Sequence, residues 1–422
     1  MQKEKFKQTE IGLIPEDWEV QELSEAIMIN PNRSLKKGQL TKKVSMDCLD
    51  PFTKKIRYFE MSKFSGGSKF KNGDTLFARI TPCLENGKTA FVDFLENSEI
   101  GFGSTEFIVL SGKDGKTDNN FVYYLAISPE LRTSAILSMT GTSGRQRVQI
   151  DLLGAVEINL PPLPEQQVIA KILSDLDSKI ELNQQMNKTL EEIGKTLFKR
   201  WFVDFEFPNE QGKPYKLSGG GMVYNDELKK EIPVGSKIVY LKDKLVFERG
   251  IEPGSAVYEN KNSGNYLRFI RVSDLNSDIS NTFIPMELGT KTCDLENVLL
   301  SLDASVGIVK IGYSGAYSTG MRKVYDKQNK WSNGFIYFLL QSEGIQNTIN
   351  QYAAGTTILH ASKSIEFMAM VVPNDDLIKK FNIIVDSVYS KILDNIIENK
   401  KLVETRDLLL PKLMSGKIRV KL

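Results

Sequence analysis

Apolar residues recur at alternating spacings of three and four along the segment from Glu165 to Phe202. One series takes every seventh residue from Ile169, and an offset series runs through Ile180, Met186 and Ile193. A narrow apolar seam that persists over five heptads predicts one long helix packed along a partner. Its 38 residues would span roughly 57 Å at about 1.5 Å per residue. A helix this long is expected to need tertiary packing for its stability.

A second seam of the same kind lies 212 positions later, starting at Phe381 (381 − 169 = 212) and ending near Met414. Each seam contains one asparagine at the same step, Asn183 in the first and Asn395 in the second. Two such helices packed antiparallel would bring the asparagines together, and a buried polar pair fixes helix register. Alternatively, both are polar residues at the edge of the seam. Pro411 should kink or end the second helix.

The segments before the two predicted helices also resemble each other. FVYYL at 121–125 matches FIYFL at 335–339, an offset of 214. At the same offset Gly141-Thr142 matches Gly355-Thr356, and Ser104-Thr105 matches Ser318-Thr319. Self-similarity at a fixed offset indicates an internal repeat. The chain is therefore predicted to contain two copies of one unit, each a globular part followed by a long helix.

Within the globular parts, short runs of β-branched and aromatic residues alternate with glycine and asparagine clusters, which predicts short strands joined by turns. Residues 120–137 are predicted to be helical. The predicted strands are 74–80, 89–94, 106–110 and 156–160 in the first copy, and 297–302, 307–311 and 368–372 in the second. The fold class that follows is mixed α/β (α+β).

These patterns divide the chain into four parts. The first globular domain is predicted at 1–162, the first long helix at 163–205, a linker and second globular domain at 206–373, and the second helix with a tail at 374–422. Antiparallel packing of the helices as a coiled coil would relate two similar domains by a pseudo-twofold axis and separate them along the helix pair.

Composition narrows the class of protein. Hydrophobic residues make up 41% and charged residues 26%, as in an ordinary globular protein. No run of 18 apolar residues and no signal peptide is seen, so we expect no membrane and a cytoplasmic location. The three cysteines include no CxxC pair and there is one histidine, so no metal site is expected. A net charge of +2 requires any nucleic-acid-binding surface to be local.

Motifs for catalysis and cofactor binding are missing. The chain has no GxxxxGK[ST] loop for nucleotide phosphates. The segment from Asn159 to Pro162 only partly matches the Asn-Pro-Pro-aromatic motif of amino-methyltransferases, because Leu160 interrupts it and no aromatic residue follows. No cofactor is therefore expected, and these absences agree with a protein that is not an enzyme.

Two similar heads at a fixed separation would suit duplex DNA, because the symmetry of a DNA-binding protein matches the spacing of its half-sites. Arginine can bond in a bidentate manner to guanine and amides to adenine, whereas Lys, Ser and Thr mostly hold phosphates. Loop residues of these types are the DNA-binding candidates, although each is otherwise a solvated loop side chain. They are Arg79, Thr81, Lys88, Thr142, Ser143, Arg145, Gln146 and Arg147 in the first copy, and Arg268, Arg271, Arg322, Thr356, Thr357, His360 and Lys363 in the second.

Several segments in this order resemble those of the DNA-specificity subunits of type I restriction-modification systems, over essentially the whole chain. They are IPEDW at 14–18, with a weaker IPVG at 232–235, the repeated Gly-Thr element, INLPPLPEQQ at 158–167 and LLLPKLMSGKI at 408–418. The second copy departs from the pattern, since VVPNDD at 371–376 replaces LPPLPEQ.

The resemblance implies a non-catalytic subunit with two target-recognition domains, each reading one half of a bipartite site in double-stranded DNA. The helices would set the spacer and dock two modification (adenine methyltransferase) subunits, and ATP-dependent restriction subunits would join the complex. Two alternatives remain: a two-headed scaffold that binds proteins, and a DNA methyltransferase or nuclease that carries its own specificity.

Overall fold

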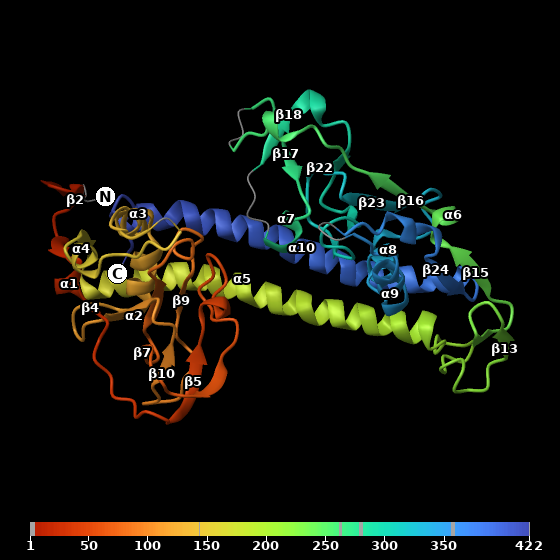
Figure 1. The fold of residues 1–422 in the computed structure, drawn as a ribbon, viewed down its shortest axis with the longest axis horizontal. Coiled ribbons are helices and arrows are strands. Elements are labelled where there is room, and N and C mark those ends of the chain that lie inside the picture. Colours follow the sequence, from red (N-terminus) through yellow and green to blue (C-terminus); the bar gives the residue numbers. More distant parts are fainter. Residues whose placement is uncertain (1–4, 143, 261–263, 278–281, 356–358, 422) are drawn as a thin grey trace. The chain divides into compact units, whose positions relative to one another are not determined.

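The structure is a computed structural model that describes residues 5–142, 144–260, 264–277, 282–355 and 359–421. The chain divides into two compact units. Unit 1 comprises residues 1–181 and 400–422, and unit 2 comprises residues 182–399. Each unit contains one globular part and a portion of each long helix (Figure 1).

Both predicted long helices are present. The first, α5 (Leu163–Phe198), continues into the π-helical turn η2 (Lys199–Val203), and the second is α10 (Asp375–Met414). In unit 2, hydrogen bonds join residues 183 and 399 and residues 187 and 395, and both pairs of numbers sum to 582; in unit 1, Asp177 pairs with Arg406, a sum of 583. A constant sum is the mark of antiparallel packing. In both units the two helices therefore pack antiparallel.

The end of α10 differs from the prediction. The helix continues past Pro411 and ends at Met414. Gly416, with φ +69°, adopts the left-handed conformation that commonly closes a helix, and its amide donates to the carbonyl of Leu413. The glycine cap rather than the proline ends the helix.

One position of the predicted seam is also wrong. Ile169, Ile180 and Asn183 are buried as expected, but Ile193 is 44% exposed. The residue that is buried in this heptad is Gly194. The ring of Phe338 occupies the space that a side chain at position 194 would need. A glycine carries no hydrophobic signal, so the apolar Ile193 beside it was assigned to the seam.

The globular part of unit 1 is built from two four-stranded sheets, a strand pair and a hairpin. The first sheet has the order β4-β11-β8-β9 and the second the order β6-β5-β10-β7. The bounds are β1 (Phe6–Thr9), β2 (Gly12–Pro15), β3 (Glu19–Glu22), β4 (Ile27–Ile29), β5 (Leu40–Val44), β6 (Glu60–Lys63), β7 (Ser68–Phe70), β8 (Thr75–Ala78), β9 (Thr89–Phe91), β10 (Gly101–Gly103), β11 (Phe107–Gly112) and β12 (Glu157–Leu160), with β1 pairing β2 and β3 pairing β12.

Short helices complete the globular part of unit 1. They are α1 (Leu23–Ala26), α2 (Asn119–Ile127), α3 (Pro129–Leu137) and α4 (Ile150–Gly154). The single helix predicted over 120–137 is therefore two. Pro129 begins α3, and Ser128 caps it by accepting a hydrogen bond from the amide of Leu131, because proline favours the first turn of a helix and disfavours helical conformation before it.

Unit 2 has the same kinds of sheets in the same chain order. Its four-stranded sheets have the orders β16-β23-β20-β21 and β18-β17-β22-β19. The strands are β13 (Met222–Asn225), β14 (Lys230–Pro233), β15 (Lys237–Tyr240), β16 (Leu245–Arg249), β17 (Tyr266–Ile270), β18 (Phe283–Pro285), β19 (Thr292–Cys293), β20 (Val298–Ser301), β21 (Val309–Lys310), β22 (Gly315–Tyr317), β23 (Met321–Asp326) and β24 (Ala369–Val372). The helices are α6 (Leu241–Lys244), α7 (Asp274–Ser277), α8 (Asn333–Leu340) and α9 (Glu343–Gln351).

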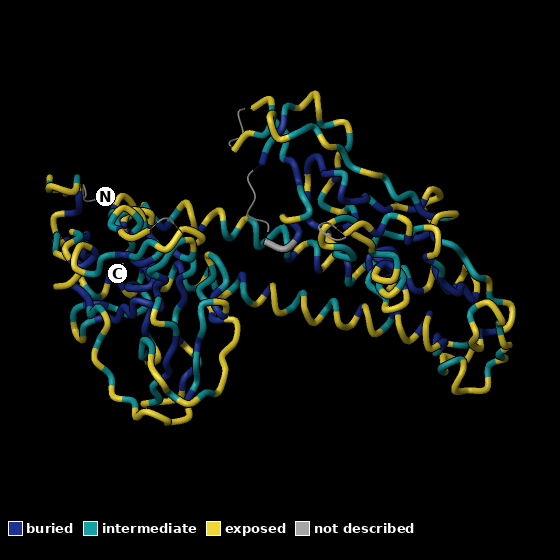
Figure 2. Tube along the Cα trace, in the orientation of Figure 1, coloured by how far each residue is buried: buried dark blue, intermediate teal, exposed yellow. Residues whose placement is uncertain are grey.

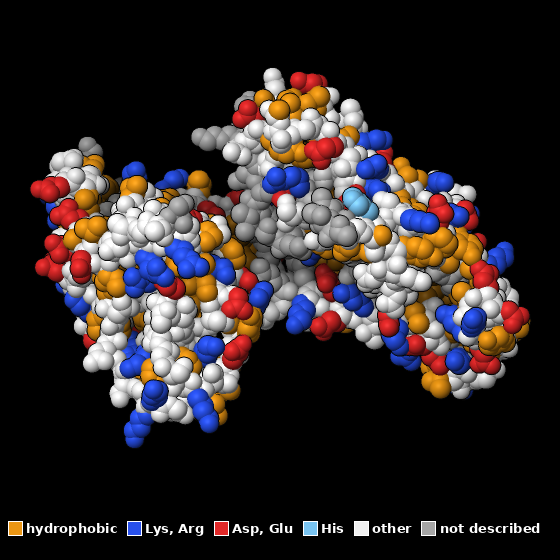
Figure 3. Space-filling view, viewed as in Figure 1, with side chains coloured by type: hydrophobic (Ala, Val, Ile, Leu, Met, Phe, Trp, Pro, Cys, Tyr) orange, Lys and Arg blue, Asp and Glu red, His pale blue; other side chains and the backbone are white. Residues whose placement is uncertain are grey.

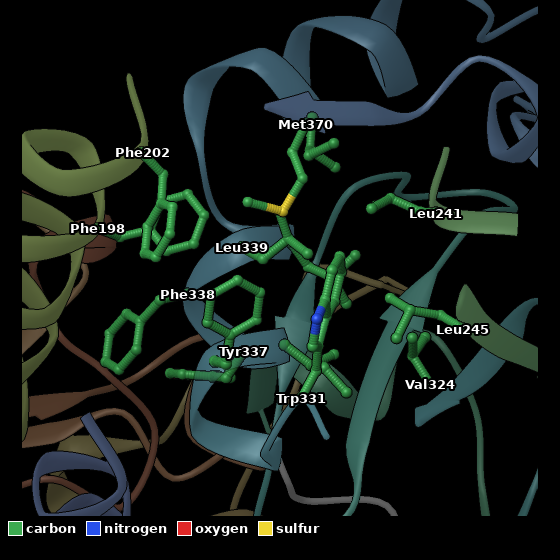
Figure 4. Packing of buried hydrophobic residues seen from close by; sticks show 14 of the residues in the cluster. Phe198, Phe202, Leu241, Leu245, Val324, Trp331, Tyr337, Phe338, Leu339 and Met370 are labelled. Carbon is green, nitrogen blue, oxygen red and sulfur yellow. The ribbon is translucent and has the colours of Figure 1, made fainter. Parts of the chain in front are cut away.

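The cores join the globular parts to the helices. In unit 2, Phe198 and Phe202 point toward the side chains of α8 (Figure 4), and the rings of Phe202 and Phe335 lie 5.4 Å apart. In unit 1, Ile169 and Leu173 belong to the same buried cluster as α2. Figure 2 shows buried segments inside each globular part and mostly exposed segments at its periphery. Each unit therefore has one core that its globular part shares with the long helices.

None of the helices in the described residues is long and apolar enough to cross a lipid bilayer.

Candidate nucleic-acid interface

In unit 1 the structure brings four of the predicted DNA-binding residues together where two segments cross. Ile80 and Thr140 both form β-bridges with Arg147. The amide of Thr81 donates to the carbonyl of Gln146 at 3.0 Å, and the amide of Gln146 donates to Thr81 Oγ1 at 3.0 Å. Arg79, Thr81, Gln146 and Arg147 therefore belong to one junction, which we define as residues 79–81 with 140–148.

A carboxylate that the sequence analysis missed organises the charges of this junction. Glu106 accepts hydrogen bonds from Arg147 Nε at 3.0 Å and Nη2 at 2.7 Å, and lies 3.9 Å from Arg79 Nε. The bond from Arg147 is the main reason that the pKa of Glu106 is lowered. The Arg147 side chain remains 42% exposed. Two arginines thus share one acid, which leaves the cluster with an excess positive charge at the surface.

The turn at the tip of the junction presents a further cation. Arg145 is exposed, and its side chain has no hydrogen bond or ion pair within the described part of the chain. Gly141 and Gly144 have φ values of +134° and +80°, and the amide of Arg145 donates to the carbonyl of Thr142. Ser143 lies outside the described residues. This exposed turn can present the guanidinium group to an anionic partner.

Lys88 is occupied elsewhere. Its Nζ donates to the carbonyl of Met46 at 2.8 Å, so the side chain ties two segments of unit 1 together. This placement favours a structural role over contact with DNA.

Unit 2 has a matching junction around its histidine. Asp303 and Ala354 both form β-bridges with His360, as Ile80 and Thr140 do with Arg147. The ring nitrogen Nδ1 of His360 lies 2.8 Å from Asp303 Oδ1, and the histidine side chain is 63% exposed. Lys363 is exposed nearby in the sequence. Thr356 and Thr357 lie outside the described residues.

Arg322, also predicted to face DNA, points inward. It is 5% exposed and donates to the carbonyls of Thr319 and Met321 and to the hydroxyl of Ser362. Burial lowers its pKa. Arg322 therefore holds the 362 segment onto strand β23, and its loop-like sequence setting gave no sign of this.

The remaining candidates lie by the second sheet of unit 2. The guanidinium carbon of Arg268 lies 5.9 Å from the ring centre of Tyr313. Asp274 accepts the amide hydrogen bond of Arg271 at 2.8 Å, and its carboxylate is 3.9 Å from that guanidinium group.

An open hollow of about 550 Å³ adjoins strand β16 in unit 2. Arg249, Glu252 and Thr319 are its polar lining residues, and Leu288 contributes an apolar wall. Arg249 was missed by the sequence analysis, although the Ser318-Thr319 pair was noted as part of the repeat. Figure 3 shows Lys and Arg side chains interspersed with acidic ones on the visible face, so positive charge is local.

Within the described residues no three His, Cys, Asp or Glu side chains are grouped to hold a metal ion. The junctions instead combine guanidinium, imidazole, amide and hydroxyl groups. These are groups that hydrogen-bond to phosphates and base edges.

Comparisons with known proteins agree with this chemistry. Residues 15–192 match the family described as the type I restriction modification DNA specificity domain. The type I restriction enzyme MjaIX specificity subunit of Methanocaldococcus jannaschii is 28% identical, with 98% of this chain and 96% of that protein covered. The HindI specificity subunit of Haemophilus influenzae is 26% identical, with 82% and 87% covered.

The fold has a counterpart among solved structures. The S subunit of a type I restriction-modification system from M. genitalium superposes with a TM-score of 0.53 at 17% identity, covering 94% of this chain and 96% of that one. These relationships confirm the resemblance drawn from the sequence, and with it the prediction of a specificity subunit rather than an enzyme. The chain is thus similar over nearly its whole length to a specificity subunit of a type I restriction enzyme, and residues 15–192 match the DNA specificity domain of such systems.

Proposed function

We propose that this chain recognises a bipartite site in double-stranded DNA, with one half-site read by each unit, and has no catalytic activity of its own. The observation that supports this most strongly is the matching junction in the two units. Arg147 in unit 1 and His360 in unit 2 occupy the same place in the same β-bridged arrangement. Arg147 is cationic and its side chain is half-exposed, and His360 is protonatable and its side chain is exposed. Two equivalent surfaces with different side chains suit two half-sites of different sequence.

In this proposal, residues 1–162 and 206–373 are the target-recognition domains, and the helices at 163–205 and 374–422 set the spacer between half-sites. The helices also dock two modification (adenine methyltransferase) subunits, and ATP-dependent restriction subunits complete the complex. The relatives' description as specificity subunits of restriction enzymes supports partners of this kind.

We further propose that buried asparagines fix the register of the helix pair. Asn183 and Asn395 are both fully buried. Asn183 donates to Asn399 at 2.9 Å and Asn395 donates to Asn187 at 2.8 Å. Since 399 − 187 and 395 − 183 both equal 212, the two bonds are repeats of one interaction. Asn183 thus bonds to Asn399, one helical turn after Asn395, and Asn395 bonds to Asn187, one helical turn after Asn183. A shift of either helix along the other would break both bonds.

The test is binding of DNA by the chain in complex with its modification subunit, followed as salt increases. Neutralising six to ten phosphates should lower affinity by about 10³- to 10⁵-fold between 50 and 200 mM salt. A two-headed protein scaffold predicts no such slope. An enzyme carrying its own specificity predicts that the isolated chain binds a methyl-donor cofactor, which calorimetric titration would detect; our proposal predicts no binding.

A further inference from the structure

The junctions of the two units match atom for atom along the backbone. In unit 1 the amide of Arg147 donates to the carbonyl of Thr140 at 2.9 Å, and the amide of Val148 donates to the carbonyl of Arg79 at 2.8 Å. In unit 2 the amide of His360 donates to the carbonyl of Ala354 at 2.8 Å, and Ala361 donates to Leu302 at 2.8 Å. Arg147 and His360 therefore occupy equivalent positions, in the middle of a three-segment bridge.

Each of these side chains faces a carboxylate, but the two carboxylates come from different positions. The amides of Arg79 and Leu302 donate to the carbonyls of Glu106 and Gly320, so Glu106 and Gly320 are equivalent. The acid of unit 2 is instead Asp303, which stands at the position of Ile80 in unit 1.

The two changes compensate. At Gly320 a Cβ atom would lie 2.7 Å from Val272 Cγ2, so unit 2 has no room for a side chain like that of Glu106. In place of it, Asp303 directs its carboxylate to His360. Two different arrangements thus place an acid beside Arg147 and beside His360. This indicates that a fixed orientation of the side chain at this position matters more than the identity of the residue that holds it.

The geometry also leaves the outward edge of each side chain available. Glu106 engages Arg147 through Nε and Nη2. The end of a guanidinium group carries further N–H donors in a rigid plane, and these match the O6 and N7 acceptors of one guanine. His360 uses Nδ1 toward Asp303, which directs Nε2 away from the acid. A side chain fixed by a neighbouring acid loses less conformational freedom on binding a base.

We propose that Arg147 and His360 are the equivalent base-reading residues of the two units, that Arg147 reads a guanine, and that Glu106 and Asp303 are their positioning residues. This inference rests on the proposed function. By contrast, Arg145 on the tip of the same junction holds phosphate, because its exposed side chain has no fixed orientation from any described neighbour.

The experiment compares the DNA methylation motifs of variant complexes. The chain and its modification subunit are expressed in a host free of DNA methylation, and methylated sites are mapped by single-molecule sequencing. Arg147→Gln should relax one guanine position of one half-site by roughly five- to a hundredfold and leave the other half-site unchanged. His360→Gln should change one position in the other half-site only. The matched control Arg145→Gln should lower methylation evenly and leave the motif intact.

Glu106→Gln separates positioning from stability. It keeps the size of the side chain and should relax the same guanine position as Arg147→Gln, to a smaller extent. A purely structural Glu106 would lower the melting temperature of the complex and leave the motif unchanged.

The inference is overturned if Arg147→Gln leaves the motif as it is, or if it lowers methylation evenly as Arg145→Gln does. A wild-type complex that is active without any fixed bipartite motif would contradict the proposed function instead, so the two failures are distinguishable.

Discussion

Replacing Gly194 by alanine should destabilise unit 2, although alanine is the better helix former. Gly194 is buried within α5. An added Cβ atom would lie 2.1 Å from Cζ and 2.2 Å from Cε1 of Phe338. The Phe338 ring on α8 is fully buried and packs edge-on against Tyr337, with ring centres 5.2 Å apart (Figure 4). A side chain at position 194 therefore requires this buried ring to shift against its neighbours.

Two opposing effects set the magnitude. Alanine in place of glycine within a helix stabilises by about 1 kcal/mol. Overpacking a filled core typically costs about 1–3 kcal/mol, and the contacts at Gly194 are well below any van der Waals distance. Contacts of 2.1 and 2.2 Å place the overpacking cost at about 2–3 kcal/mol, so we expect a net loss of about 1–2 kcal/mol in the free energy of unfolding.

Urea denaturation followed by circular dichroism measures the change. Gly344→Ala is the matched control, since nothing lies within 4 Å of a Cβ at that helical position, and it should be neutral or slightly stabilising. In a Phe338→Leu background, Gly194→Ala should cost much less because the obstructing ring is gone. The packing argument is refuted if Gly194→Ala alone is as stable as the wild type.

Three further changes probe buried polar groups by the same denaturation assay. Asn395→Leu leaves Asn187 Oδ1 without its donor and should cost about 1–3 kcal/mol. Replacing Asn187 as well by leucine should restore much of the loss, and no recovery would contradict the bonded-pair account. Arg406 and Asp177 form a 2.8 Å ion pair, and their side chains are 8% and 10% exposed. Arg406→Met removes this pair and should lower the free energy of unfolding by about 3–5 kcal/mol. A cost below about 1 kcal/mol would contradict a stabilising buried pair. Burial lowers the pKa of Lys54 from 10.5 to about 8, so the folded protein loses this proton at a lower pH than the unfolded chain. The stability of the wild type should therefore rise relative to that of Lys54→Met as pH increases from 8 to 10.5. Parallel pH profiles of the two proteins would disprove this.

The long helices were predictable because their signal is periodic. Seam residues such as Ile169 and Asn183 repeat over five heptads, and the error at Ile193 arose where the buried residue is a glycine. The strands were harder to find. Strand β10, which was not predicted, has three residues that are all buried, so it shows no alternation of polar and apolar positions.

The candidate site was predictable only in part, for a different reason. Arg147 and His360 could be named from their loop-like surroundings, but their partners could not. Glu106 lies 41 residues from Arg147 and Asp303 lies 57 residues from His360, so only the folded structure brings them together. Arg322 had the same local character as Arg147, yet the tertiary structure uses it inside unit 2.

The most direct measurement is the methylation motif produced by the wild-type chain with its modification subunit in a methylation-free host. Our account predicts one bipartite motif with a fixed gap of roughly one DNA turn or less between half-sites, because a helix pair of roughly 57 Å limits their separation to about 1.7 turns. Inserting four residues into both helices should change the gap and keep both half-sites. An active methyltransferase that modifies DNA without such a motif would contradict the account.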